Sequence, residues 1–570
     1  MGGRGDAAER GRPRPCPRRP ALVPRSAAPV EGADGVGEPG LPAPADHRHR
    51  APEAARRRRS RALPEDQPGP GRAPPQGAGE LTEPATAADP SVGHRLARNT
   101  VFSAVGEGSN LLLFLLGFFA ARYLAPSAFG VYSAAFAFVG LFRILPDFGM
   151  SHASTLAISR DRSRAAGLMG NLLGFQLVLS VITLALCLGS GRLRYDGVLW
   201  TAVLVLAFDL VLKSVKSTLR WLLKSHERFG AEAVSLLLER GLLLGLGTAI
   251  LLGGGGVVGF VLVFACVRAI DTTGLFLWVD RRVLALRPAF DLGVWWDLFR
   301  KGLPFAYAGA MITMFFQVDA VMLERMRGAE EVGLYRAPVL VLEGLTLIPR
   351  IFGYALIPTM AALHPRAPEG VTALYRRGVK YLLLCGLPIA AFGLIAAQPF
   401  VAFLFGASYA PSAAAARILI PAAALMFLSN FGETALACVD RWRTIVVVST
   451  ACLLLNIALN LLLIPRLGYV GAAWATLATE GAYFAATAMS LWLFGHRISW
   501  ISVLARPALA TAVFAGALWV SLGLGLLASS LVACAAFAAA TVVLRVWDPK
   551  ETDLARRLLQ GAAADPGDLA

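Results

Sequence analysis

The chain has 570 residues, of which 56% are hydrophobic and only 16% are charged, and its mean hydropathy is +0.58. A soluble domain carries about a quarter charged residues, so this composition excludes an ordinary soluble protein. Many separate apolar runs of about twenty residues predict a polytopic α-helical membrane protein, because a membrane β-barrel would show short alternating strands instead. Basic loops and an arginine-rich tail explain the net charge of +16, so we predict no nucleic-acid partner.

Residues 1–95 are rich in Pro, Gly, Ala and Arg and contain an arginine run at 56–59. Such a segment cannot bury enough apolar surface to offset the entropy lost on ordering, so we predict a disordered cytoplasmic tail. Its arginine run could contact anionic lipids. The alternative is an over-extended reading frame, with translation starting near residue 90.

The hydrophobic pattern after residue 98 predicts about fourteen transmembrane helices. We expect an all-α fold with two pseudo-symmetric six-helix lobes and two further C-terminal helices. The predicted spans are 99–121, 128–149, 167–190, 197–219, 231–252, 257–279, 302–324, 333–361, 378–398, 412–437, 444–465, 470–494, 503–523 and 526–546. The predicted domains are an N-lobe (96–280), an amphipathic linker (281–301), a C-lobe (302–496), a C-terminal pair (497–547) and a cytoplasmic tail (548–570).

Basic residues alternate between loops in a way that predicts the orientation. If the N-terminus is cytoplasmic, the inside loops are strongly basic, as the positive-inside rule requires. The outside loops then hold only Arg122, Arg192, Arg194, Arg325, Arg327 and Arg466. The inside set is Arg160, Arg162, Arg164, Lys213, Lys216, Arg220, Lys224, Arg228, Arg281, Arg282, Arg287, Arg300, Lys301, Arg366, Arg376, Arg377, Lys380, Arg441, Arg443, Arg497 and Arg506. We therefore predict a multi-pass protein of the cytoplasmic membrane with both termini inside.

Two sequence echoes suggest that the halves are homologous. Gly130-Val-Tyr132-Ser-Ala recurs as Gly333-Leu-Tyr335-Arg-Ala, each time after a span and a short loop. A weaker echo pairs the segment 256–259 with 468–471. Repeated halves around a midplane site are typical of secondary transporters.

Ionisable groups at membrane depth are costly unless they face a bundle interior or a wet cavity, so they are the candidate site residues. The predicted substrate cavity contains Arg143, Arg240, Arg350, Gln317 and Glu343. A guanidinium stays charged and matches the geometry of phosphate, so three arginines suggest an anion-attracting cavity; a structural pairing is the alternative for each.

Asp319 and Asp209 are candidates for ion coupling, because a desolvated carboxyl can take up and release a proton. A fixed partnership with an arginine is the alternative. Arg268 and Asp271 are three residues apart on one helix and predict an internal salt bridge, whereas Asn456 and Asn460 predict hydrogen bonds between helices.

Enzyme signatures are lacking: there is no GxSxG, HExxH or Walker loop, and the seven histidines do not cluster. We predict no catalytic residue, no metal site and no cofactor.

Four parts of the sequence match the pattern of a known family: 121–132, 147–150, 317–319 with 330–337, and 460–473. Through them the sequence resembles the polysaccharide-transporter branch of the MOP (MATE-like) superfamily, the Wzx-type oligosaccharide flippases, and the resemblance covers about residues 96–546. It implies two six-helix lobes around a central cavity and transfer of an undecaprenyl-diphosphate-linked oligosaccharide across the cytoplasmic membrane by alternating access. The implied partners are that lipid-linked oligosaccharide, membrane lipids, and a polysaccharide polymerase and glycosyltransferases.

Three alternatives stay open at this point. A multidrug/cation antiporter of the same superfamily should favour an acidic cavity, which the three arginines argue against. A lipid II flippase shares the architecture and would also use arginines. An integral-membrane glycosyltransferase or polymerase usually needs a long outside loop, and the sequence has only short ones.

Overall fold

The structure, a computed structural model, describes residues 90–547 except 162, 164 and 365. The predicted tail 548–570 lies outside the described residues, as does the tail 1–95 apart from its last six residues. Those six begin the first helix, so the helical region starts a little earlier than the sequence predicts.

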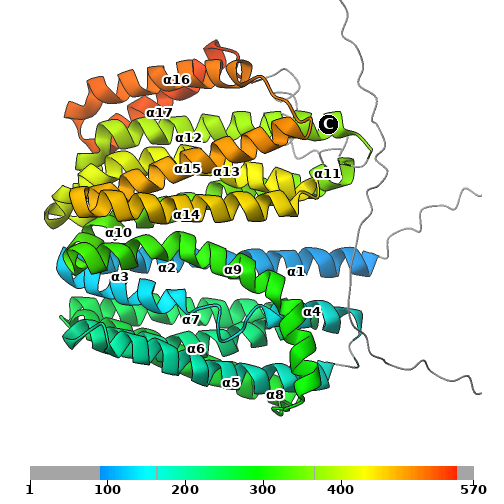
Figure 1. Cartoon of the computed structure of the whole chain (residues 1–570). Coiled ribbons are helices and arrows are strands. Elements are labelled where there is room, and N and C mark those ends of the chain that lie inside the picture. Colours follow the sequence, from blue (N-terminus) through cyan, green and yellow to red (C-terminus); the bar gives the residue numbers. More distant parts are fainter. Residues whose placement is uncertain (1–89, 162, 164, 365, 548–570) are drawn as a thin grey trace, which may run out of the picture. The chain divides into compact units, whose positions relative to one another are not determined.

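The first half of the described chain forms eight helices, coloured blue to green in Figure 1. They are α1 (Pro90–Gly108), α2 (Asn110–Tyr123), α3 (Pro126–Leu141), α4 (Met150–Arg160), α5 (Ala165–Arg192), α6 (Gly197–Ser225), α7 (Phe229–Leu252) and α8 (Gly256–Arg282).

The second half of the described chain forms nine α-helices and two short 3₁₀ helices. They are α9 (Leu292–Arg327), α10 (Ala329–Leu345), α11 (Leu347–Leu363), α12 (Pro368–Phe405), η2 (Ala407–Ser412), α13 (Ala413–Cys438), α14 (Trp442–Leu467), α15 (Tyr469–Leu493), α16 (Trp500–Ser521), η3 (Leu522–Leu524) and α17 (Leu526–Val543).

These helices pack as two lobes. In the N-lobe α6 packs on α3 and α8, and α7 packs on α1, α2 and α8; in the C-lobe α13 packs on α12 and α15, and α14 packs on α9 and α15. The pair α16–α17 leans on α12 through a small apolar cluster that contains Phe514 and Leu518. The predicted all-α, two-lobed class is therefore confirmed.

The predicted number of fourteen spans is not confirmed. Among the described residues, twelve helices are long and apolar enough to cross a membrane. The second predicted span is represented by α3, which has only 16 residues because the chain turns over residues 142–149, where Phe148 and Gly149 have positive φ angles. The twelfth predicted span, α15, is rich in Ala, Gly and Thr and is not one of these twelve helices.

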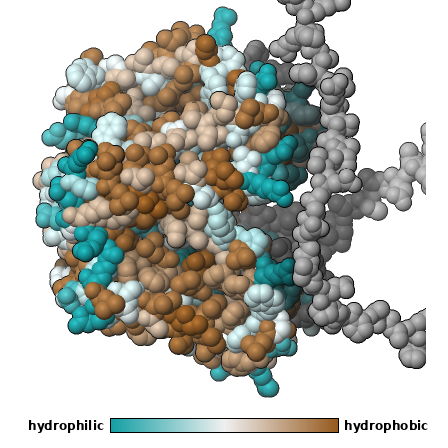
Figure 2. Space-filling model, viewed as in Figure 1, coloured by the Kyte–Doolittle hydropathy of each residue, from teal (hydrophilic) through white to brown (hydrophobic). Residues whose placement is uncertain are grey.

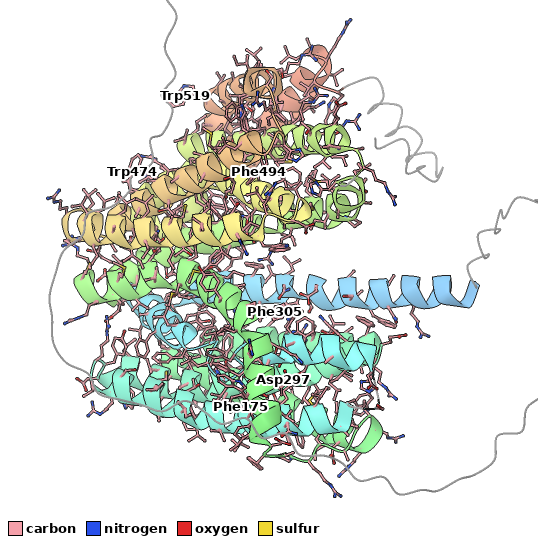
Figure 3. The ribbon with its side chains drawn as sticks, turned by 45° about the vertical axis from the view of Figure 1, so that its right-hand side comes forward. Phe175, Asp297, Phe305, Trp474, Phe494 and Trp519 are labelled. Carbon is pink, nitrogen blue, oxygen red and sulfur yellow. The ribbon has the colours of Figure 1, made fainter. Side chains whose placement is uncertain are left out.

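The predicted linker 281–301 is not a separate element. Its second half is the first part of α9, which bends at Pro304, because proline cannot donate the helical hydrogen bond. Asp297 and Phe305 lie on either side of the bend (Figure 3). The first part of α9 packs on the N-lobe, where Trp295 stacks on Phe175 with ring centroids 4.7 Å apart, so one helix connects both lobes.

The predicted span 333–361 is two helices, α10 and α11, that meet at Thr346. The Thr346 hydroxyl donates to the Glu343 carbonyl at 2.6 Å, a local bond that competes with continuation of the helix.

The bundle has two ends, which we name by their connections. The hairpin face carries the short turns around 124–125, 193–196, 328, 406 and 468, whereas the terminal face carries the start of α1 and the end of α17 (Figure 1). In the visible face of Figure 2, hydrophobic residues cover most of the middle and hydrophilic residues gather toward the two edges. This banding is the pattern of a protein that crosses a membrane.

Candidate functional site

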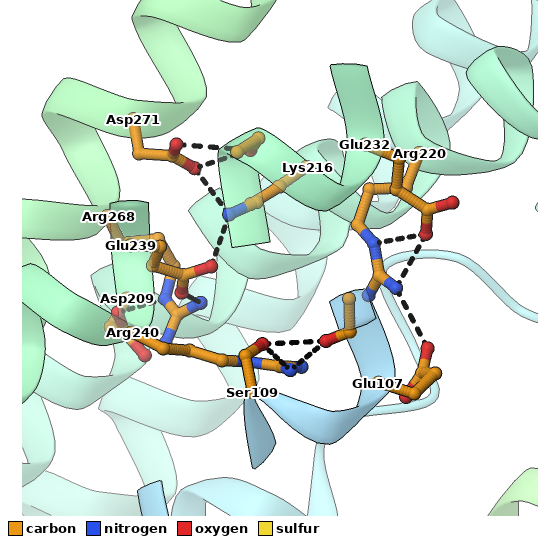
Figure 4. A network of polar contacts seen from close by, with 12 residues as sticks. Glu107, Ser109, Asp209, Lys216, Arg220, Glu232, Glu239, Arg240, Arg268 and Asp271 are labelled. Carbon is orange, nitrogen blue, oxygen red and sulfur yellow. Dashed lines mark hydrogen bonds and ion pairs between the residues drawn. The ribbon is translucent and has the colours of Figure 1, made fainter. Parts of the chain in front are cut away.

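A buried network of charges joins three helices of the N-lobe (Figure 4). Arg268 on α8 donates to Asp209 on α6 at 2.5 Å and to Glu239 on α7. Lys216 on α6 pairs with Glu239 and with Asp271 on α8. Charges in a low-dielectric interior are tolerated only when they are paired and hydrogen-bonded, so this network holds α6, α7 and α8 in one arrangement.

The predicted salt bridge between Arg268 and Asp271 is wrong. Asp271 instead binds Lys216 and accepts from Ser235 at 3.1 Å. Arg268 pairs with Asp209 and Glu239 on the two neighbouring helices, and these acids are closer to it than Asp271 on its own helix.

A stripe of basic residues on α6 explains much of this arrangement. Lys213, Lys216, Arg220 and Lys224 are spaced by three or four residues and therefore share one helix face. They were counted with the basic residues of the inside loops, although the predicted span 197–219 contains Lys213 and Lys216. Because α6 continues to Ser225, all four lie on this helix. Their partners follow the helix: Arg220 pairs with Glu232 at 2.7 Å and with Glu107 at 3.3 Å, and Lys224 pairs with Glu232 at 3.3 Å.

Lys213 is the exception on that stripe. It is half-buried and has no ion pair among the described residues. Arg143, in the turn after α3, is exposed and likewise has no acid partner within the described chain. The N-lobe therefore holds two basic side chains that have no ion pair among the described residues, beside its paired network.

Arg240, a predicted cavity residue, is engaged in the structure. It is buried and donates to the Gly106 carbonyl at 2.7 Å and to the Ser109 hydroxyl at 2.5 Å. Both acceptors lie where α1 gives way to α2, so Arg240 supplies the hydrogen bonds that the interrupted helix cannot supply itself.

The C-lobe contains a different buried cluster, centred on Asp319 of α9. Its carboxylate accepts from Tyr335 at 2.9 Å, from Asn460 at 2.8 Å and from Thr476 at 3.3 Å. Asn460 also donates to Asn456 at 3.0 Å, and its own carbonyl oxygen is buried without a hydrogen bond in the described part of the chain. The predicted inter-helix bonding of the asparagines is confirmed for Asn460, which joins α14 to α9.

The two predicted coupling carboxyls thus differ. Asp209 is paired with an arginine, whereas the donors to Asp319 are hydroxyl and amide groups. Tyr335 belongs to the second copy of the repeated motif, and its role in this cluster was not predicted.

The remaining predicted cavity residues lie on α9, α10 and α11 of the C-lobe. Glu343 pairs with Arg336 at 3.1 Å; Arg336 is buried and was not among the predicted site residues. Gln317 is half-buried, and its side chain lies against Gly140 of α3, where an added Cβ would be 3.3 Å from the Gln317 Cγ. Arg350 is exposed on α11. The structure therefore does not bring the three predicted arginines together into one cluster.

The repeated motifs meet at the lobe boundary, where α3 packs against α10. A Cβ on Gly130 would overlap the Ala329 carbonyl oxygen and lie 2.9 Å from the Gly333 nitrogen. Reciprocally, a Cβ on Gly333 would overlap the Pro126 carbonyl oxygen and lie 3.1 Å from the Gly130 nitrogen. Equivalent glycines of the two copies thus allow the two backbones to touch, as small residues do in membrane helix pairs.

The second echo also has a structural role. Gly256 is the first residue of α8, and Gly468 directly precedes α15; these are the last helices of the two lobes. Both glycines have positive φ angles, 60° and 58° respectively. Only glycine adopts this conformation at low cost, so each turn requires its glycine.

Further contacts join the lobes at the hairpin face. Arg122 at the end of α2 donates to the carbonyls of Phe403 and Leu404 at 2.7 and 3.2 Å. Tyr409 of η2 donates to the Leu124 carbonyl at 3.2 Å. Together with the α3–α10 crossing, these bonds close the bundle at that face.

Within the described ranges, no three His, Cys, Asp or Glu side chains lie together as a metal site would require.

Known proteins share this architecture. The inward closed conformation of the lipid II flippase MurJ superposes with a TM-score of 0.66 and 12% identity, over 78% of this chain and 99% of that chain. An inward-facing multidrug resistance MATE family transporter of the MOP superfamily superposes with a TM-score of 0.55 and 14% identity, over 70% of this chain and 100% of that chain. At these identities the likeness shows the fold. No curated protein has a sequence that matches this chain.

The fold and its banded surface define a multi-pass α-helical membrane protein with a transporter architecture. The family model described as polysaccharide biosynthesis protein matches residues 96–364, and the MatE model matches residues 304–462. The chain is therefore similar to transporters and flippases of the MOP superfamily.

Proposed function

We propose that the protein is a flippase that moves an undecaprenyl-diphosphate-linked oligosaccharide across the cytoplasmic membrane for cell-surface polysaccharide synthesis, by alternating access. The observation that carries the proposal is the match of residues 96–364 to the polysaccharide biosynthesis family, and two basic side chains of the N-lobe without an ion pair among the described residues support it. The proposed orientation puts the terminal face, and hence both termini, in the cytoplasm.

Charge supports an anionic cargo. Lys213 and Arg143 lack acid partners among the described residues, and an unpaired cation at membrane depth is costly. A diphosphate supplies the missing negative charge and hydrogen-bond acceptors. Of the predicted arginines, Arg240 fits this role least, because it is buried and its Nη1 already donates to Gly106 and Ser109. Gln317, Glu343 and Arg350 remain candidates for contact with the sugars or the second phosphate.

We assign ion coupling to Asp319 in preference to Asp209. Asp209 is fixed by Arg268 at 2.5 Å, so its charge is already balanced. Asp319 is buried among hydroxyl and amide groups. Asn460 donates to it through its amide nitrogen, and the amide oxygen of Asn460 is buried without a hydrogen bond among the described residues. Carboxylate, amide and hydroxyl oxygens can hold a proton or a small hard cation.

The transport test uses the purified chain in liposomes. A fluorescent undecaprenyl-diphosphate oligosaccharide is added, and a membrane-impermeant reductant bleaches the label in the exposed leaflet. The wild type is expected to move labelled lipid from the protected leaflet to the exposed leaflet, where the reductant bleaches it over time. Lys213→Gln is expected to slow this about tenfold or more, because hydrogen bonds to charged groups contribute about 1.5–3 kcal/mol. Lys301→Gln is the matched control, since Lys301 is exposed and pairs only locally with Asp297.

Two other cargoes discriminate the alternatives. A lipid II analogue tests whether the chain moves the cargo of the lipid II flippase MurJ, and a cationic dye tests for activity like that of a multidrug resistance MATE family transporter. If lipid II moves faster than the oligosaccharide lipid, lipid II is the cargo instead of the proposed one. Movement of the dye alone, unaffected by Lys213→Gln, would refute the flippase.

The coupling test applies a proton or sodium gradient to the same liposomes. Asp319→Asn is expected to abolish stimulation by the effective gradient while leaving downhill exchange, because an amide cannot change its charge. Stimulation that survives in Asp319→Asn but disappears in Asp209→Asn would transfer the role to Asp209.

A further inference from the structure

A polar pocket of about 520 Å³ lies at the hairpin face, away from the charge clusters described above. Its walls come from both lobes. Arg194 belongs to the connection between α5 and α6 of the N-lobe, whereas the other lining residues belong to the α9–α10 hairpin of the C-lobe: Glu324, Arg325, Met326, Arg327, Gly328 and Glu331. The volume is in the range of small-ligand sites.

The pocket concentrates arginines on a face that has few. Of the six arginines predicted outside, three line this pocket: Arg194, Arg325 and Arg327. Basic residues on the outside oppose the topological signal of a membrane protein, so their placement at one point is not explained by orientation.

The other outside arginines have evident structural roles or lie apart. Arg122 donates to backbone carbonyls between the lobes, and Arg192 pairs with Asp196 at 2.5 Å on its own loop.

The two carboxylates in the pocket do not balance its positive charge. Glu331 pairs with Arg327 at 3.0 Å and also accepts from the Tyr469 nitrogen at 2.9 Å. Glu324 is 3.9 Å from Arg194, too far for a hydrogen bond. Arg325 is exposed and has no ion pair in the described part of the chain. Three arginines against two glutamates leave one net positive charge.

We propose that this pocket binds an oxyanion, a phosphate or carboxylate group, on the outer side of the membrane. Guanidinium groups bind both by paired, charge-assisted hydrogen bonds. Because Arg194 is on one lobe and Arg325 and Arg327 are on the other, the bound group connects the lobes and keeps the hairpin face closed. The site therefore senses anionic product that has already crossed, and it opposes the outward opening needed for the next cycle.

The anion site goes beyond the transport function and is tested without transport; its outer location and its sensing of crossed product rest on the proposed function. The full chain in lipid nanodiscs is titrated with inorganic pyrophosphate and, separately, with glucuronate, and binding is followed by calorimetry. Saturable binding of pyrophosphate identifies a phosphate group as the ligand; tighter binding of glucuronate identifies an acidic sugar.

Arg325→Gln is expected to weaken binding about 10- to 100-fold, since a charge-assisted hydrogen bond is lost. Arg192→Gln is the matched control on the same face and should bind as the wild type does. Spin labels at Leu193, which is 93% exposed, and at exposed Ala407 report the separation of the lobes. Ligand should narrow that distance distribution in the wild type but not in Arg325→Gln.

Absence of saturable binding by both ligands would overturn the site. Equal weakening by Arg325→Gln and Arg192→Gln would also overturn it, because the effect would then follow surface charge in general. Binding that leaves the distance distribution unchanged would overturn the closure role.

Discussion

The α3–α10 crossing gives the sharpest prediction of how the lobes separate. In Gly130→Ala the new Cβ would overlap a backbone carbonyl oxygen, that of Ala329, which cannot rotate away as a flexible side chain can. Overpacking of this kind costs about 1–3 kcal/mol, and only in the state in which the two helices touch. The ratio of closed to open hairpin face should therefore fall about 5- to 150-fold.

Spin labels at Leu193 and Ala407, in a background without reactive cysteines, measure this ratio as a distance distribution. Gly130→Ala should increase the population at long distance. Gly245→Ala is the matched control. Gly245 also lies in a helix, but it is exposed, and a Cβ there would have nothing within 4 Å. An unchanged distribution in Gly130→Ala would refute the reasoning.

Symmetry provides a second check. Gly333→Ala should produce a similar shift, because its Cβ would overlap the equivalent carbonyl oxygen of Pro126. The double variant should cost less than the sum of the two single variants, since one outward movement of α10 relieves both overlaps and neighbouring sites are not additive. Strict additivity would mean that the two glycines act at separate contacts.

Three further predictions concern the rest of the molecule. Arg268→Gln should destabilise the purified protein by about 3–5 kcal/mol, because it leaves the buried Asp209 carboxylate without its ion pair. Lys301→Gln, in an exposed pair, should change the free energy of unfolding by less than about 1 kcal/mol; equal losses would contradict the network. Burial, and then the charge of the neighbouring His364, lower the pKa of His496 in the loop after α15 below its ordinary value of about 6.5. The unfolded chain then binds this proton more readily, so stability present above about pH 6.5 should be lost as the pH falls toward the folded pKa. His496→Gln should flatten this part of a melting-temperature profile; an identical slope would exclude His496 as its source. Gly174→Ala should displace the segment before α9 at a cost of about 1–3 kcal/mol, because the new Cβ would overlap the Ala289 carbonyl oxygen. Limited proteolysis of that segment should then be faster, and an unchanged rate would contradict the contact.

Much of the fold could be predicted because it depends on hydrophobic content and local pattern. Apolar runs predicted the helices, and the two echoes predicted two related lobes, whose glycines have equivalent positions in the structure. Element boundaries were less predictable. The break at Thr346 depends on a local hydroxyl bond, and the continuity of α9 through Pro304 depends on its packing against both lobes.

The candidate site was predicted less well, because partners come from other helices. The three- and four-residue spacing from Lys213 to Lys224 indicates one charged face of a helix, which is what α6 has. From the sequence, these residues were instead counted as loop charge. No sequence signal distinguished Arg240, which is occupied by backbone and hydroxyl acceptors, from an arginine free to bind a ligand.

Local sequence is enough to specify a helical membrane protein with repeated halves, since the burial of apolar helices and the formation of short glycine turns are properties of individual segments. The matching of charges, in contrast, follows from tertiary packing. Arg268 binds Asp209 and Glu239 in preference to Asp271, which is nearer in sequence, and Lys213 is left without an acid partner among the described residues. Pairing in a low-dielectric interior depends on the distances between helices, which no single segment of sequence encodes.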